Sequence, residues 1–76
     1  MKLTQIEYFI TVCECGSFSR AAEKCHISQP GISKAIRELE EECGVALFQR
    51  NRNNIQITRR GRILLEHARQ FENHYR

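Results

Sequence analysis

One stretch decides the fold: residues 16–40 read GSFSRAAEKCHISQPGISKAIRELE. Ser17 and Ser28 are residues typical of helix N-caps, and Pro30 is tolerated in the first helical turn. Apolar residues recur at helical spacing after each serine, and an adjacent pair of alanines lets another helix approach closely. A short helix, a turn of about three residues and a longer helix ending at Gly44 predict a helix-turn-helix unit.

The flanking sequence predicts the remaining elements. Before the unit, apolar spacing predicts a helix over residues 4–15, with Thr4 and Glu7 forming a capping box and Gly16 ending the helix. After it, the alternation over residues 55–58 follows an Asn-rich segment and predicts a short β-hairpin with a basic tip. Thr58 then caps a further helix. We therefore expect a mainly α fold, a winged helix-turn-helix with a three-helix core, a hairpin wing and a C-terminal helix.

Length and composition favour one small, folded domain. The chain has 76 residues and 41% hydrophobic residues, and no apolar run approaches the ~20 residues that cross a bilayer. The N-terminus lacks the pattern of a signal peptide. We expect a cytoplasmic protein with no membrane association, whose four cysteines (13, 15, 25 and 43) are reduced and serve as small apolar residues rather than metal ligands.

Charge is concentrated in one segment. The net charge is only +3, but residues 50–62 hold five arginines and no acid, which leaves seven basic and nine acidic residues elsewhere. A basic cluster on a nearly neutral body is typical of polyanion binding, although a solvated face would show the same charges.

The predicted helix over residues 29–43 has a polar outer face near its start. Gln29, Ser33, Lys34 and Arg37 lie along one side, opposite the apolar positions. Each of these residue types can contact base edges or phosphates, and an α-helix fits the major groove of DNA. The four glutamates of this helix lie toward its other end.

The combined pattern closely resembles the N-terminal domain of LysR-type transcriptional regulators. The resemblance rests on GSF-x-x-AA from Gly16, SQP-x-x-S from Ser28, LE-x-x-x-G-x-x-LF-x-R ending at Arg50, and T-x-x-G from Thr58, and it covers essentially the whole chain. It implies sequence-specific binding to double-stranded promoter DNA, with residues 29–43 in the major groove and the wing on the backbone or minor groove.

The resemblance also implies roles for individual residues. Gln29, Pro30, Ser33 and Lys34 match base-proximal positions, Arg37 matches a phosphate contact, and Ser17 and Ser28 offer hydroxyls or backbone N–H groups to phosphates. Arg50 matches an arginine that either contacts DNA or braces the wing. Asn53 stands where relatives often carry arginine, so insertion into the minor groove passes to Arg52 or is weaker.

A division of the chain follows from the same resemblance. Residues 1–58 would form the DNA-binding domain, and residues 59–76 would begin a linker helix that pairs two subunits. We expect a homodimer through the apolar line Leu64, Ala68, Phe71 and Tyr75, and a higher oligomer in a full-length form. A small-molecule inducer would act only through an effector domain that these 76 residues do not include.

Two rival classes remain to be weighed. The chain has no Asp, no glycine-rich phosphate loop and no metal-ligand spacing among its histidines, so we expect neither an enzyme nor a cofactor. The stronger rival is a winged-helix module that binds proteins rather than DNA. A retained acid-free helix face and an arginine-rich wing favour DNA.

Overall fold

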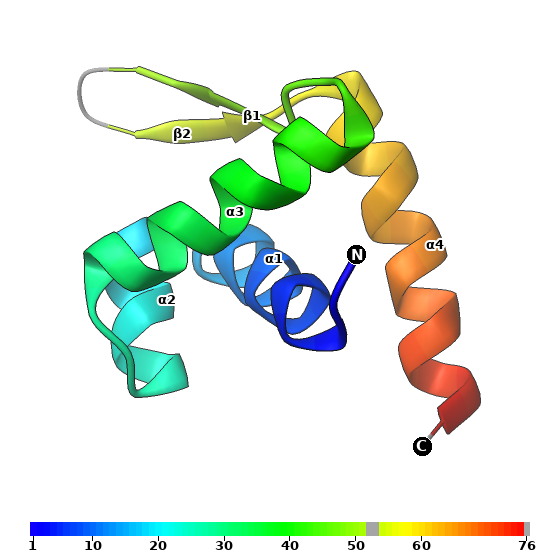
Figure 1. Cartoon of the computed structure of the whole chain (residues 1–76), viewed down its shortest axis with the longest axis horizontal. Coiled ribbons are helices and arrows are strands. Elements are labelled where there is room, and N and C mark those ends of the chain that lie inside the picture. The colour runs from blue at the N-terminus through cyan, green and yellow to red at the C-terminus, as the bar shows by residue number, and fades with distance from the viewer. Residues whose placement is uncertain (52–53, 76) are drawn as a thin grey trace.

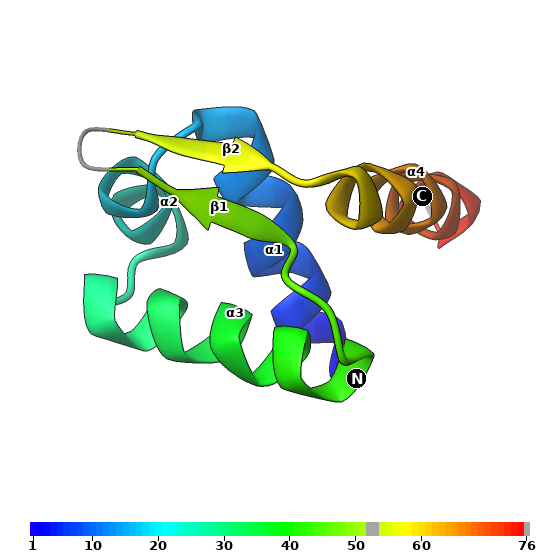
Figure 2. The same ribbon diagram turned by 90° about the horizontal axis from the view of Figure 1, so that it is seen from above.

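The structure, a computed structural model, confirms the winged helix-turn-helix. It describes the backbone of residues 1–51 and 54–75 and the side chains of residues 1–51 and 54–70. The elements in chain order are α1 (Leu3–Cys15), α2 (Phe18–Cys25), α3 (Gln29–Cys43), β1 (Phe48–Arg50), β2 (Ile55–Ile57) and α4 (Arg59–Tyr75). Helices α1, α2 and α3 pack together, the hairpin passes over α2, and α4 extends along the other side (Figures 1 and 2).

Three hydroxyl caps define where α2, α3 and α4 begin. The side chains of Ser17, Ser28 and Thr58 each accept a hydrogen bond from the backbone N–H three residues later, at 3.2, 3.1 and 3.0 Å. Gly16 and Gly44 end α1 and α3 in the left-handed conformation, with φ of 67° and 72°, which glycine adopts without a steric cost. All five positions were predicted from sequence, and the structure confirms them.

The predicted start of α1 is wrong. The helix is capped by Lys2, whose backbone N–H donates to Oε1 of Gln5 at 3.1 Å, so Thr4 lies inside the helix rather than at its cap. Gln5 is only 6% exposed, and its Nε2 also donates a hydrogen bond to Oε1 of Glu38 on α3 at 3.4 Å. This contact between two helices determines the cap, and a local sequence pattern contains no information about it.

The core lies where α1, α2 and α3 meet beneath the hairpin. Phe9 and Phe48 pack with ring centroids 5.4 Å apart, and Phe18 meets Phe48 edge-on at 5.8 Å, a favoured geometry for aromatic pairs. The buried apolar set is Phe9, Ile10, Val12, Ala21, Ala22, Ile32, Ile36, Leu39, Leu47, Phe48 and Ala68. The hairpin and α4 are therefore attached to the three helices through apolar contacts.

The wing is the antiparallel hairpin of β1 and β2. Phe48 pairs with Ile57 and Arg50 with Ile55, and Asn51 N–H donates to Asn54 O at 2.8 Å near the turn. These pairs confirm the predicted hairpin. Arg52 and Asn53, which follow Asn51 in the sequence, lie outside the described residues.

Candidate nucleic-acid interface

The beginning of α3 presents the predicted contact residues together on one side. Three apolar residues on the opposite side, Ile32, Ile36 and Leu39, are completely buried and fix the rotation of the helix. The predicted residues then face outward: Gln29, Pro30, Lys34 and Arg37 are exposed, and Ser33 is half-buried. Because residues 29–37 include no acid, this stretch of the helix places no negative side chain of its own against a phosphate or a base edge.

Gln29 is held in place by a residue of the neighbouring helix. The Ser19 hydroxyl, on α2, donates to Gln29 Oε1 at 3.0 Å. This bond orients the amide while its nitrogen keeps two N–H donors that can reach a ligand. Sequence reasoning missed Ser19 because the two residues are ten positions apart on different helices, and no local spacing indicates the pair.

The capping serines can still serve a ligand. In both Ser17 and Ser28 the oxygen accepts a backbone N–H, and the hydroxyl hydrogen remains able to donate. Ser28 is exposed and lies next to Gln29 at the start of α3, whereas Ser17 is half-buried at the start of α2. Both stand at helix N-termini, where the partial positive charge of the helix dipole attracts anions.

Arg50 makes the bracing contacts that one of its two predicted roles requires. Its Cζ lies 4.8 Å from the centroid of the Phe18 ring, and its Nη2 lies 3.9 Å from Oε1 of Glu40. The first geometry is a cation–π contact, and together the two contacts join the wing to α2 and α3. With 42% of its side chain exposed, the guanidinium also remains at the surface.

Glu40 is a second residue whose role the sequence did not reveal. In the sequence, Glu40 is one of four glutamates toward the C-terminal end of the helix, with nothing to distinguish it from the other three. In the structure its Oε2 accepts hydrogen bonds from the backbone N–H groups of Leu47 and Phe48, at 2.8 and 3.3 Å. Its side chain is 18% exposed, so it is largely enclosed rather than solvated.

Further arginines surround the base of the wing. Arg59, Arg60 and Arg62 are exposed in the first turns of α4, which begins directly after the hairpin (Figure 1). Cations at a helix N-terminus oppose its dipole. A facing phosphate would offset that cost. Because the three guanidinium groups are exposed, the start of α4 extends the positive surface beyond the wing.

The cysteines are packing residues in this structure. All four are half-buried and unpaired, and burial raises the pKa of the Cys13 thiol to about 12, with Arg69 opposing the shift and Glu14 adding to it. Within the described ranges, no three or more His, Cys, Asp or Glu side chains gather as metal ligands. No helix in this part of the chain is both long and apolar enough to span a bilayer.

The fold and its exposed helix define the class of protein. A helix-turn-helix with an acid-free recognition face and a basic hairpin is a winged helix-turn-helix of the kind that DNA-binding regulators use. Residues 3–62 match the family described as "Bacterial regulatory helix-turn-helix protein, lysR family". The chain belongs to that family.

Its relatives are named as transcriptional regulators. The regulator TfdT of Cupriavidus pinatubonensis is 40% identical over 71 residues, which are 93% of this chain and 31% of TfdT. The dual regulator OxyR of Escherichia coli K12 is 41% identical over 69 residues, 91% of this chain and 23% of OxyR. The chain thus spans 31% of the length of TfdT and 23% of the length of OxyR.

Solved structures agree with the fold. The CbnR DNA-binding domain in complex with DNA superposes with a TM-score of 0.92 at 38% identity, covering 96% of this chain and 84% of that one. The BenM DNA-binding domain on its catB site 1 DNA gives 0.94 at 35% identity, covering 99% and 84%. Both neighbours are structures of DNA-bound domains.

Proposed function

We propose that this chain binds specific sequences in double-stranded promoter DNA and so regulates transcription. Helix α3 would enter the major groove, and the wing would lie on the backbone or in the minor groove. The observation that carries the proposal is the acid-free polar face at the start of α3, rigidly presented by a core like that of the DNA-bound CbnR and BenM domains.

The residues divide by the chemistry they offer. Gln29, Ser33 and Lys34 carry donors or acceptors that match base edges, and Pro30 lies beside them as an apolar contact. Arg37 suits a phosphate, as do the helix N-termini at Ser17 and Ser28. Arg50 serves the wing from its place between Phe18 and Glu40, and the tip residues Arg52 and Asn53 supply the groove contact.

The setting of this activity follows from the family. Residues 1–58 act as the DNA-binding domain, and residues 59–76 begin the linker helix that pairs two chains. The resemblance to the family implies an effector domain in the full-length form, through which a small-molecule inducer and higher assembly would act. Bacterial DNA lies in the cytoplasm, so we place the protein there, associated with the nucleoid.

Two substitutions on α3 test the proposal. Ser33→Ala and Lys34→Ala should change the base preference, because a good direct base contact is worth about 1–3 kcal/mol of discrimination. Lys24→Ala is the matched control for the lost charge, since Lys24 is exposed on α2. The measurement is selection from a randomised duplex pool at fixed salt.

Arg52→Ala addresses the wing with the same assay. Loss of this positive charge from the wing should weaken all duplexes similarly and reduce the salt slope of binding by about one. Helix variants that keep the wild-type motif would contradict the placement of α3 in the groove. A wild-type protein that shifts no duplex in a gel at low salt would instead favour the protein-binding module.

A further inference from the structure

The first residues of the wing are held by a side chain of α3. Glu40 Oε2 accepts the N–H groups of Leu47 and Phe48 at 2.8 and 3.3 Å. Hydrogen bonds from backbone amides to a carboxylate are stronger than neutral ones, and at 18% exposure this carboxylate is shielded from competing water. One side chain of α3 therefore binds the backbone where the wing begins.

The end of the wing is fixed at the same place. Thr58 N–H donates to Leu47 O at 2.9 Å, and the Thr58 hydroxyl donates to Ala46 O at 2.7 Å. The Leu47 residue is thus bonded on its N–H side to α3 and on its C=O side to the residue that caps α4. Both ends of the hairpin meet at this single joint.

The second oxygen of Glu40 acts further along the wing. Oε1 lies 3.9 Å from Nη2 of Arg50, and the same guanidinium packs 4.8 Å from the centroid of Phe18 on α2. The Glu40 carboxylate therefore contacts Leu47, Phe48 and Arg50, which include both the first and the last residue of β1. The two strands are only three residues long, too short to define the direction of a hairpin without such support.

We propose that Glu40 is the positioning residue of the wing, and that it sets the direction in which the hairpin leaves α3. This inference rests on the proposed function, because that direction decides which flank of a DNA site the wing reaches while α3 occupies the groove. The side chains of Leu47 and Phe48 are buried and keep the strand attached to the core. Removing the carboxylate therefore loosens the angle of the wing and leaves the fold in place.

The first arm of the test measures the free protein. Glu40→Ala is compared with Glu41→Ala, which removes the same charge from an exposed neighbour on α3. Amide residual dipolar couplings of residues 48–50 and 55–57 are fitted to the alignment of α1, α2 and α3. We expect the wild type and E41A to fit one rigid body, and E40A to depart from it in the hairpin alone.

The second arm measures binding. The probe is the duplex that the wild type selects from a random pool, used at full length and trimmed at the flanks. The wild type and E41A should lose affinity on trimming, whereas E40A should bind both duplexes within about twofold, because its wing no longer adds backbone contacts. E40Q keeps one neutral acceptor oxygen and should lie between; it takes over the test if E40A does not fold.

The outcomes separate this inference from the proposed function. Hairpin couplings in E40A that still fit the body of the protein overturn the inference, as does a trimming penalty equal to that of E41A. A wild type that binds no duplex overturns the proposed function, and the couplings then decide the role of Glu40 by themselves.

Discussion

Gly61 lies where the first turn of α4 meets the base of the wing. A Cβ atom at this position would collide with the carbonyl oxygen of Leu47 and lie 2.8 Å from Cγ1 of Ile57. That carbonyl accepts a hydrogen bond from the Thr58 N–H, so moving it away would break this bond. Gly61 is buried at the contact between α4 and the segment before β1. This contact leaves no room for a side chain larger than hydrogen.

Gly61→Ala is therefore expected to destabilise the domain. Overpacking a close contact costs about 1–3 kcal/mol, which outweighs the gain in helix propensity of about 1 kcal/mol. Urea unfolding followed by circular dichroism measures the change. Arg60→Ala, an exposed neighbour in the same turn, should change the free energy of unfolding by less than about 0.5 kcal/mol; equal effects of the two substitutions would contradict the steric explanation.

Cys13 should be an unreactive thiol at neutral pH. Burial raises its pKa to about 12, and the thiolate is the reactive form. At pH 8 we expect alkylation by iodoacetamide to be more than about tenfold slower than in the urea-unfolded chain, as mass spectrometry of the Cys13 peptide can show. The rate should increase as the pH rises toward 12.

The same shift links Cys13 to stability. The folded state holds the thiol proton more tightly than the unfolded state, so this contribution is present below about pH 9 and is lost as pH rises toward 12. A Cys13 alkylation rate at pH 8 that is the same in folded and unfolded protein would contradict the burial of the thiol.

At the scale of elements, α3 has two ends with different tasks. Its first half presents the contact residues, and its second half uses glutamates to hold other parts of the chain: Glu38 bonds Gln5 of α1, Glu40 holds the wing, and Glu42 pairs with the N-terminal amine. The helix that we propose reads DNA is thus also the element to which its neighbours are attached.

The elements were predictable from sequence because their signals are local. Hydroxyl caps at Ser17, Ser28 and Thr58, glycines at helix ends and the alternation of residues 55–58 each act within a few residues. The start of α1 was not predictable in this way, because Gln5 takes its conformation from α3. The outward face of α3 was predictable too, since apolar spacing determines which side is buried.

The supporting contacts of the site depend on packing between elements. Ser19 with Gln29, and Glu40 with Leu47, join residues seven or more positions apart, and no periodicity indicates them. Sequence reasoning left both roles of Arg50 open for the same reason. The position of Phe18 beneath the guanidinium is a consequence of how α2 meets the wing.

The contact between α2 and α3 gives a prediction about specificity. Ser19→Ala removes the bond to Gln29 Oε1 and frees the amide to rotate, so base preference opposite Gln29 should relax by up to about 1 kcal/mol, the usual net worth of a hydrogen bond. Ser19→Thr keeps the hydroxyl and is the control. Selection from a duplex pool measures the preference, and an unchanged motif in S19A would show that Ser19 does not orient the amide.

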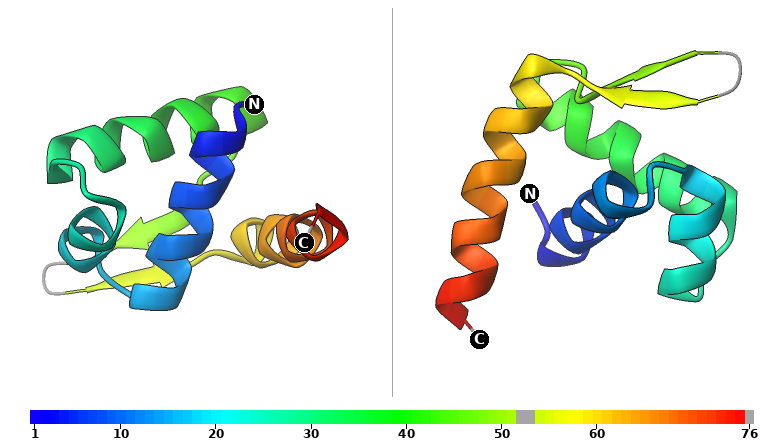
Figure 3. Two further views of the ribbon diagram at one scale, coloured as in Figure 1. Left: turned by 90° about the horizontal axis from the view of Figure 1, so that it is seen from below. Right: turned by 180° about the vertical axis from the view of Figure 1, so that it is seen from behind.

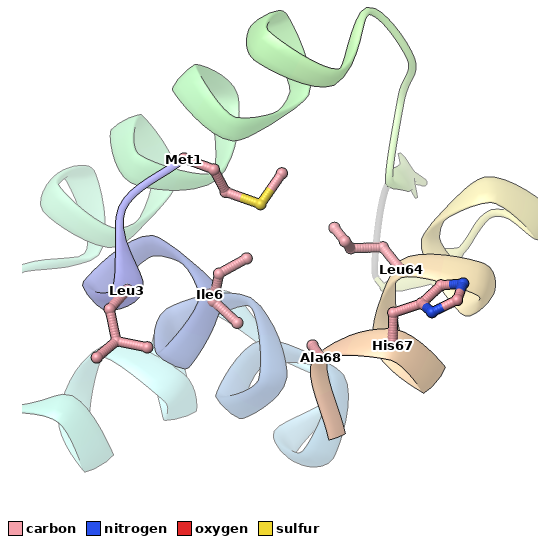
Figure 4. A pocket seen from close by; sticks show the side chains of 6 residues that line it. All are labelled: Met1, Leu3, Ile6, Leu64, His67 and Ala68. Carbon is pink, nitrogen blue, oxygen red and sulfur yellow. The ribbon is translucent and has the colours of Figure 1, made fainter. Parts of the chain in front are cut away.

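At the scale of the whole molecule, an apolar groove lies between the beginning of α1 and α4. Met1, Leu3, Ile6, Leu64, His67 and Ala68 line it (Figure 4), and α4 extends past the rest of the body, as the view from behind shows (Figure 3). Ala68 is buried in the core of its own chain, whereas Met1, Leu3 and Ile63 are 60%, 58% and 46% exposed. Phe71 and Tyr75 continue α4, with side chains outside the described residues.

These exposed apolar side chains, at the N-terminal end of the chain and on α4, are consistent with the proposed pairing of two chains. A two-fold pair would bury the same patch from each chain and would place two α3 helices in successive major grooves of a palindromic site. A stable interface buries about 800 Å² per partner. The patch would need α1 as well as α4 to approach that area, so we expect a weak, concentration-dependent dimer.

Ile63→Glu tests this pairing without disturbing the core, because Ile63 is 46% exposed in the single chain. A charge buried without a partner is costly, so sedimentation equilibrium should show the dimer of the wild type weakened more than tenfold, by the roughly 1.4 kcal/mol that such a factor represents. Gln56→Glu, exposed on β2, adds the same charge to the wing rather than to the apolar side of α4 and should leave the dimer unchanged. Affinity for a palindrome should fall in I63E while binding to a single half-site persists.

A wild type that stays monomeric at high micromolar concentration, even on palindromic DNA, would contradict the pairing.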